Sequence, residues 1–268
     1  MPTTGQLSLL IATIALFVIG GAFSLLRIAW TTRTPRVISR CFLGAGIVCA
    51  IGVLIWHSAW RGQWTPLGDN FDTLIWLATL LAIFVLYLQR HRALGALDWF
   101  VMPLVVLMLI LAAIFGRTEY HTYVGGAWDW VHRVTAYGGA VAFAVAAATG
   151  AMYVVASRRL REKRTIGPQF GSLERLEHLT MMSVTLGFAL LTIGMITGGI
   201  KMFAGPGRHV PQAKIVLALI VWLVYAVVLH APINPSFRGR KVAVLSVVGF
   251  ILMLGTIVTV LLLSPSAR

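Results

Sequence analysis

The chain has 268 residues, of which 59% are hydrophobic and only 11% charged, and its formal net charge is +14. Soluble domains carry about 25% charged residues, so this composition excludes an ordinary soluble protein and indicates an integral membrane protein. The positive charge does not indicate nucleic-acid binding, because the basic residues are confined to short loops between apolar runs.

Eight apolar runs are long enough to cross a bilayer as helices, which takes about 20 residues each. They cover residues 6–29, 40–58, 71–89, 97–115, 131–156, 179–202, 212–230 and 241–263. The runs do not alternate in polarity, which argues against a transmembrane barrel. We therefore predict an all-α polytopic integral membrane helix bundle with about eight transmembrane helices, forming one transmembrane domain over residues 1–268.

The distribution of basic residues predicts the orientation of the bundle. Fifteen of the 22 lysines and arginines lie in loops on one side, around residues 27–40, 90–92, 158–175 and 238–241, and seven lie on the other. The richer side is expected to be cytoplasmic. We therefore predict a multi-pass protein of the inner (plasma) membrane with both termini outside the cytoplasm.

Two local features of the chain can also be predicted. Cys41 and Cys49 lie eight residues apart in one apolar run. That spacing corresponds to about 12 Å along a helix, which is too far for a disulfide. Ser172 precedes an acidic first turn and is expected to cap the helix that follows.

The seven histidines fall at the two ends of the predicted spans, and none lies at mid-span. The outer tier consists of His57, His121, His132 and His209, and the inner tier of His91, His178 and His230. Neutral imidazole is a common axial ligand of haem iron. Histidines from two helices could therefore hold a porphyrin at either end, with His132, His57 and His230 as the main candidates for axial ligands.

Each histidine also has a purely structural interpretation. His178 follows Glu177 and could simply pair with it, and His230 could be a C-terminal residue favoured by the helix dipole. His209 lies in a short glycine- and proline-containing loop. His57 and His132 are the strongest functional candidates, because ionisable groups at the ends of apolar spans are costly unless they have a role.

Tryptophans gather on the predicted outer side, and two of them stand next to His132. Trp128 and Trp130 offer apolar ring faces that suit a porphyrin, although an aromatic belt at the membrane interface explains part of the pattern. Arg133 follows His132 and could bind a haem propionate, or it could extend toward lipid headgroups.

Four stretches of the chain, in the same order, resemble the cytochrome c assembly transmembrane family, which includes the haem-handling CcsA/ResC and CcmC proteins and their HemX-like relatives. Residues 62–77 resemble the family's helix-entering segment, and Trp128, His132, Ala136 and Tyr137 resemble its outer-histidine segment. The run SLERLE at 172–177 with GFALLTIGMITG at 187–198 is similar to its most specific motif. Residues 222–230, WLVYAVVLH, resemble a fourth segment of the family. The family-like core covers about residues 55–232.

The resemblance implies a membrane protein of cytochrome c biogenesis that binds haem b, as cargo or cofactor, and presents it outside the cytoplasm for attachment to apocytochrome c. It implies His132 as an outer ligand and His230 as an inner one, the latter with His178. The partners implied are haem, apocytochrome c, other assembly proteins and the lipid bilayer, with the chain as a possible subunit of a haem lyase. The family's tryptophan-rich WWD signature is missing, since residues 205–214 contain no tryptophan and no aspartate.

Three other functions remain open on the sequence. A HemX-like accessory or a structural assembly subunit would not deliver haem. A b-type electron-transfer cytochrome would also place histidines in two tiers. A transporter would need mid-membrane polar residues or broken helices, and the sequence offers neither.

Overall fold

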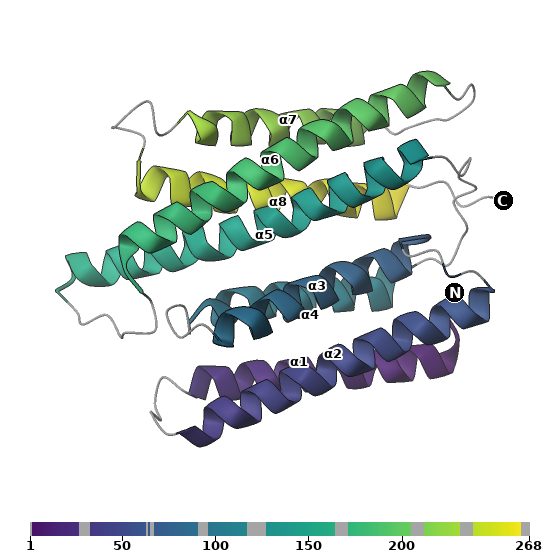
Figure 1. The fold of residues 1–268 in the computed structure, drawn as a ribbon, viewed down its shortest axis with the longest axis horizontal. Helices are drawn as coiled ribbons and strands as arrows, with labels where there is room; N and C mark the ends of the chain where they lie inside the picture. The colour runs from purple at the N-terminus through teal and green to yellow at the C-terminus, as the bar shows by residue number, and fades with distance from the viewer. Residues whose placement is uncertain are drawn as a thin grey trace. The chain divides into compact units, whose positions relative to one another are not determined.

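A computed structural model describes residues 2–26, 33–62, 64, 67–90, 96–116, 127–163, 171–204, 212–230 and 238–263. These residues form eight α-helices, shown in Figure 1: α1 (Thr4–Leu26), α2 (Arg33–Arg61), α3 (Asn70–Arg90), α4 (Leu97–Phe115), α5 (Ala127–Arg161), α6 (Leu173–Ala204), α7 (Gln212–Leu229) and α8 (Arg240–Leu263). Each helix covers all or most of one of the apolar runs, so the prediction of an all-α polytopic bundle is confirmed.

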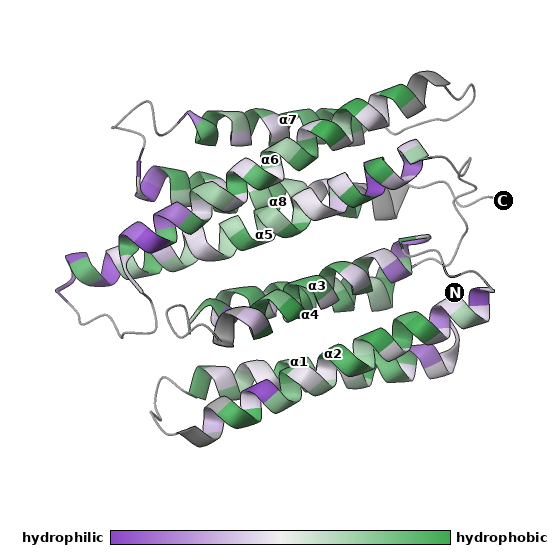
Figure 2. Ribbon diagram, viewed as in Figure 1, coloured by the Kyte–Doolittle hydropathy of each residue, from purple (hydrophilic) through white to green (hydrophobic). Residues whose placement is uncertain are grey.

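Seven of the helices are long and apolar enough to span a membrane, and the apolar part of α7, Ile215–Leu229, is shorter. Figure 2 shows apolar residues along the middle of the helices and hydrophilic residues gathered toward their ends. This pattern is the one that a bilayer imposes, because charged groups are costly in its hydrocarbon core.

The chain divides into two compact units, Met1–His121 and Thr122–Arg268. In the first, α1 packs against α2 and α4, and α3 packs against the same two helices. In the second, α5 packs against α6 and α8, and α7 packs against α8 and α6. A single domain over the whole chain remains a prediction.

The first unit begins with a reciprocal helix cap. The Gln6 backbone N–H donates to Thr3 Oγ1, and the Thr3 backbone N–H donates to Gln6 Oε1. Two backbone N–H groups at the N-terminus of α1, which have no acceptor within the helix, are thereby satisfied. Further along, α1 and α2 approach closely at Gly20, where an added Cβ would lie 3.3 Å from that of Phe42. Cys41 and Cys49 both lie on α2, and neither forms a disulfide, which agrees with the spacing argument.

The core of the second unit is built on stacked rings. The Phe143 and Tyr225 rings stack with centroids 3.6 Å apart, and the Tyr225 hydroxyl donates to the Ser246 carbonyl at 3.2 Å. These contacts join α5, α7 and α8. The Ser172 hydroxyl accepts the Arg175 backbone N–H at 3.2 Å, which confirms Ser172 as the cap of α6.

Candidate functional site

His132 lies in the second turn of α5, against the C-terminal half of α6. Its Nδ1 lies 2.8 Å from the Gly194 carbonyl oxygen and 3.4 Å from the Thr197 hydroxyl. The ring lies so close to Gly198 that an added Cβ there would be 2.9 Å from Cε1. The imidazole is therefore held by the backbone of the facing helix.

The contact with Gly194 determines which nitrogen of His132 carries the proton. A carbonyl oxygen only accepts, so Nδ1 donates its N–H to it, and the lone pair of the neutral ring is on Nε2. Histidines that bind metals commonly donate the other ring N–H to a carbonyl or carboxylate, which fixes the tautomer and the ring orientation. The donor set of His132 thus fits an axial ligand of haem iron.

The other predicted residues of this segment lie on the same stretch of α5. Trp128 is one helical turn before His132 and its side chain is 58% exposed, and Trp130 is 41% exposed. The Arg133 guanidinium carbon lies 5.8 Å from the centroid of the Trp130 ring. Two exposed aromatic faces and a guanidinium therefore accompany His132 at the start of α5, and these are groups that suit an apolar ring with carboxylate substituents.

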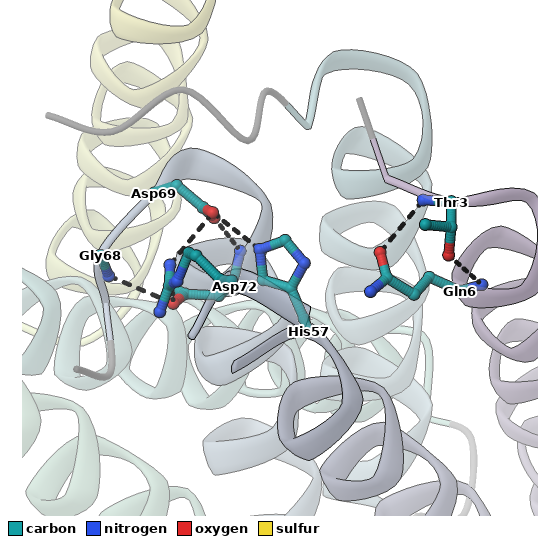
Figure 3. A network of polar contacts seen from close by, with 7 residues as sticks. Thr3, Gln6, His57, Gly68, Asp69 and Asp72 are labelled. Atoms are coloured by element: carbon teal, nitrogen blue, oxygen red, sulfur yellow. Dashed lines mark hydrogen bonds and ion pairs between the residues drawn. The ribbon is translucent and has the colours of Figure 1, made fainter. Parts of the chain in front are cut away.

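His57 has a different environment, in a buried ion cluster of the first unit (Figure 3). Its side chain is fully buried, and its Nε2 lies 2.7 Å from Asp69 Oδ2. Arg61 Nη1 lies 3.1 Å from both Asp69 Oδ2 and Asp72 Oδ2. The four side chains form a network that joins the end of α2 to the start of α3.

The same two carboxylates cap α3. Asp69 Oδ1 accepts the Asp72 backbone N–H at 2.8 Å, and Asp72 Oδ2 accepts the Gly68 backbone N–H at 3.2 Å. Burial alone would raise the pKa of Asp69. The hydrogen bonds from His57 and from the Asp72 backbone, with the charges of His57 and Arg61, outweigh burial and lower that pKa below its usual value.

This cluster limits what His57 can do as a ligand. Its Nε2 is engaged by Asp69, and its Nδ1 is buried without a hydrogen-bond partner among the described residues. Coordination through Nδ1 would require iron to enter a fully buried position. The structural role that the sequence left open for His57 is therefore supported by this geometry more than the role of a ligand.

The inner histidines lie at the opposite end of the second unit from His132. His178, in the first turns of α6, and His230, at the end of α7, are both exposed. Between His178 and Gly194 the helix rises about 24 Å. His230 Nδ1 lies 2.7 Å from the Ala226 carbonyl, which gives it the same tautomer as His132. Glu177, which the sequence offers as an alternative partner of His178, accepts the Gly239 backbone N–H at 3.1 Å.

Some of the predicted site falls outside these observations. His209 lies outside the described residues, and His57 belongs to a different unit from His132. Among the residues that the structure describes, no group of three or more histidine, cysteine or acidic side chains could hold a metal ion. A haem ligand is a single imidazole on each face, so this finding does not bear on haem.

The ion cluster was not predicted, although its signal was present in the sequence. Asp69 and Asp72 stand three residues apart just before an apolar run, which is the spacing of a reciprocal helix cap. Arg61 is one of the seven basic residues on the predicted outer side, and the sequence does not distinguish it from the other six. Its place in the cluster depends on the short connection between α2 and α3, in which Leu67 has a φ of 59°.

The profile of the family described as "Cytochrome C assembly protein" matches residues 64–264. The chain belongs to this family. The match covers about three quarters of the chain and includes His132, His178, His209 and His230, whereas His57 lies before it.

Curated proteins with sequence similarity carry related names. The chain is 45% identical over 80 residues to "Cytochrome c biogenesis protein CcsA" of Thermosynechococcus vestitus, covering 29% of this chain and 24% of that protein. It is 37% identical over 108 residues to the protein of the same name from Microcystis aeruginosa, covering 40% and 33%. The similar segment thus spans about a quarter to a third of these relatives.

Proposed function

We propose that the chain acts in cytochrome c biogenesis, where it binds haem b in the membrane and offers it outside the cytoplasm for attachment to apocytochrome c. The observation that carries this proposal is the hydrogen bond from His132 Nδ1 to the Gly194 carbonyl, in a segment matched by the family profile. It fixes the tautomer that an axial histidine needs. When bound, haem would supply the iron that His132 holds and the porphyrin that a partner joins to apocytochrome.

Residues around His132 would bind and orient the porphyrin. Trp128 and Trp130 would lie against its faces, and Arg133 would bind a propionate, since its guanidinium matches a carboxylate with two parallel hydrogen bonds. Of the two outer partners considered, His209 is preferred to His57. His209 lies inside the matched segment, whereas His57 is fully buried and bonded to Asp69.

His230 and His178 would form the inner tier, where haem is accepted before it reaches the outer face. Both side chains are exposed at the same end of the second unit. The bias of basic residues toward this end supports its placement on the cytoplasmic side of the inner membrane, with both termini on the other side.

One observation favours a second function. Residues 205–214, which lead into and begin α7, contain no tryptophan and no aspartate, so the family's usual aromatic platform is missing. An accessory that stabilises an assembly complex without delivering haem is consistent with this difference. Such a protein would co-purify with its partner and would bind no haem at His132.

Titration of the detergent-purified protein with haem tests the proposal. The wild type is expected to shift the Soret band, and H132A is expected to weaken binding at least about tenfold. H91A is the control, because it removes a histidine outside the proposed site. H57Q is expected to lower the thermal stability and to leave the Soret shift intact.

The same experiment can overturn the assignment. No Soret shift in the folded wild type would favour the accessory function. An unchanged shift in H132A would exclude His132 as a ligand, and loss of the shift in a folded H57Q variant would replace it with His57.

A further inference from the structure

A cavity of about 300 Å³ opens in the second unit between the end of α5 and the start of α8. Five polar residues line it, through both their charged or hydroxyl groups and their aliphatic carbons: Ser157, Arg158, Arg161, Glu162 and Arg240. In Figure 2, hydrophilic residues gather at these two helix ends. The cavity lies far from His132, which is near the other end of α5, and it takes no part in the function proposed above.

Close backbone contacts hold the two helices together beside this cavity. A Cβ added at Gly150 of α5 would lie 2.8 Å from the Ala243 carbonyl oxygen of α8. Gly239, just before α8, has a φ of 67° and lies against the Tyr153 hydroxyl, and its N–H donates to Glu177 of α6. The three arginines are therefore presented by a rigid junction of helices.

The charge of the lining is positive. Arg158 Nε donates to Glu162 Oε1 at 2.9 Å, so the one carboxylate of the cavity is paired within α5 and its following turn. Arg161 and Arg240 add two further positive charges. An anion with several oxygens would satisfy guanidinium groups that converge in this way.

The first turn of α8 gives an independent reason to expect an anion. The N-terminus of a helix carries partial positive charge, and acidic residues are favoured there. α8 instead begins with Arg240 and Lys241 and has no acidic residue in its first turn. The Glu177 carboxylate of α6 accepts the Gly239 N–H at this end and supplies one negative charge. A bound anion would add to this compensation for the two basic residues of the first turn.

The surface of α8 below the cavity is apolar. Val244, Val248 and Ile251 follow Arg240 at helical spacing, and their side chains are 41%, 43% and 60% exposed. Residues four, eight and eleven positions after Arg240 lie along one face of the helix. One face of α8 thus places an arginine at the membrane surface above a stripe of exposed aliphatic side chains.

We propose that this junction binds an anionic phospholipid, with the phosphate between Arg161 and Arg240 and an acyl chain along Val244, Val248 and Ile251. A soluble phosphate would use only the arginines. The aliphatic stripe directly beneath them favours a lipid, and basic pockets between transmembrane helices are a known form of headgroup site.

The test measures lipid binding to the full-length protein in detergent micelles by native mass spectrometry and by thermal unfolding. Phosphatidylglycerol is the anionic probe, and phosphatidylcholine is the zwitterionic comparison. We expect phosphatidylglycerol to bind preferentially and to raise the unfolding temperature. R240Q is expected to weaken its binding about fivefold, and R240K less than R240Q.

R175Q is the matched control. Arg175 is also an exposed arginine in the first turn of a helix, α6, but it does not line the cavity. It is expected to change binding less than twofold or so, because it alters net charge equally and leaves the junction intact. Equal effects of R240Q and R175Q, equal binding of the two lipids, or displacement of phosphatidylglycerol by millimolar inorganic phosphate would each overturn the proposal.

Discussion

His57 in α2 and His132 in α5 look alike in the sequence, since each stands at the end of an apolar span near tryptophans, but they bond to different groups. His57 is bonded to a carboxylate within a buried cluster that also contains Arg61 and Asp72. His132 is bonded to a backbone carbonyl of the facing helix. The first arrangement satisfies charges that the fold has buried, and the second orients one ring through a backbone carbonyl.

This difference distinguishes the histidine of a stabilising ion cluster from the histidine proposed as a ligand. A buried carboxylate pair needs cations nearby, so removing any member of the His57 cluster leaves a charge that is costly in the interior. A carbonyl partner imposes no such requirement, and the neutral ring keeps the basicity that iron requires. The comparison can be tested by perturbing each site separately.

The largest expected effect is on the cluster around His57. R61M removes the guanidinium that lies 3.1 Å from both Asp69 and Asp72, and it leaves two buried carboxylates with one fewer cation. We expect a loss of about 3–5 kcal/mol in the free energy of unfolding, measured by thermal or denaturant unfolding in detergent. R175Q removes an exposed arginine and should have little effect. Equal stabilities would mean that the cluster does not hold α2 against α3.

The next effect concerns the contact between His132 and α6. G198A would place a methyl group 2.9 Å from His132 Cε1, so the imidazole or the helix must shift. We expect a loss of about 1–3 kcal/mol in stability and weaker haem binding, although no ligand is removed.

The neighbouring residue supplies the control for that change. A Cβ added at Gly199 meets no atom within 4 Å, so G199A should leave stability within about 1 kcal/mol of wild type and haem binding unchanged. If G198A and G199A have the same haem affinity, the close approach of α6 does not orient the ring.

The helices of this protein could be predicted from its sequence, whereas the roles of its histidines could not. The eight helices were predictable because a helix that crosses a bilayer needs about 20 largely uncharged residues, and seven of them reach that length in the described part of the chain. The different roles of His57 and His132 were not predictable, because their partners come from tertiary packing. Gly194 is 62 residues away from His132, and nothing local in α5 specifies it.

The ion cluster could have been predicted in part from the sequence. The eleven residues between His57 and Asp69 contain a turn, and the spacing of Asp69 and Asp72 is that of a helix cap. A basic residue four positions after His57 then lies on the same face of α2. The sequence pattern alone did not show that Arg61 turns toward these carboxylates rather than toward lipid headgroups.

A smaller effect than that of R61M is expected from pH, because protonation neutralises one member of the cluster without removing it. The pKa of Asp69 is lowered from its ordinary value of 3.8. A lowered pKa means that the folded state binds this proton less readily than the unfolded state. The stabilisation is therefore complete above about pH 4 and is lost as the pH falls through the folded-state pKa.

Thermal unfolding between pH 6 and pH 2.5 measures this contribution. The wild type should lose stability below about pH 4, and D69N should lose less over the same interval because position 69 no longer titrates. Parallel curves for the two proteins would contradict the lowered pKa of Asp69.

The smallest expected effect tests the tautomer of His132 directly. The Thr197 hydroxyl donates to the Ile193 carbonyl at 2.8 Å and lies 3.4 Å from His132 Nδ1. If Nδ1 donates to the Gly194 carbonyl, this hydroxyl is not needed, and T197V should cost less than about 1 kcal/mol and leave the Soret shift unchanged. If the hydroxyl instead donates to Nδ1, the proton of the ring is on Nε2. T197V would then alter haem binding markedly. Nε2 of His132 would carry a proton and could not bind iron, just as Nε2 of His57 is already bonded to Asp69.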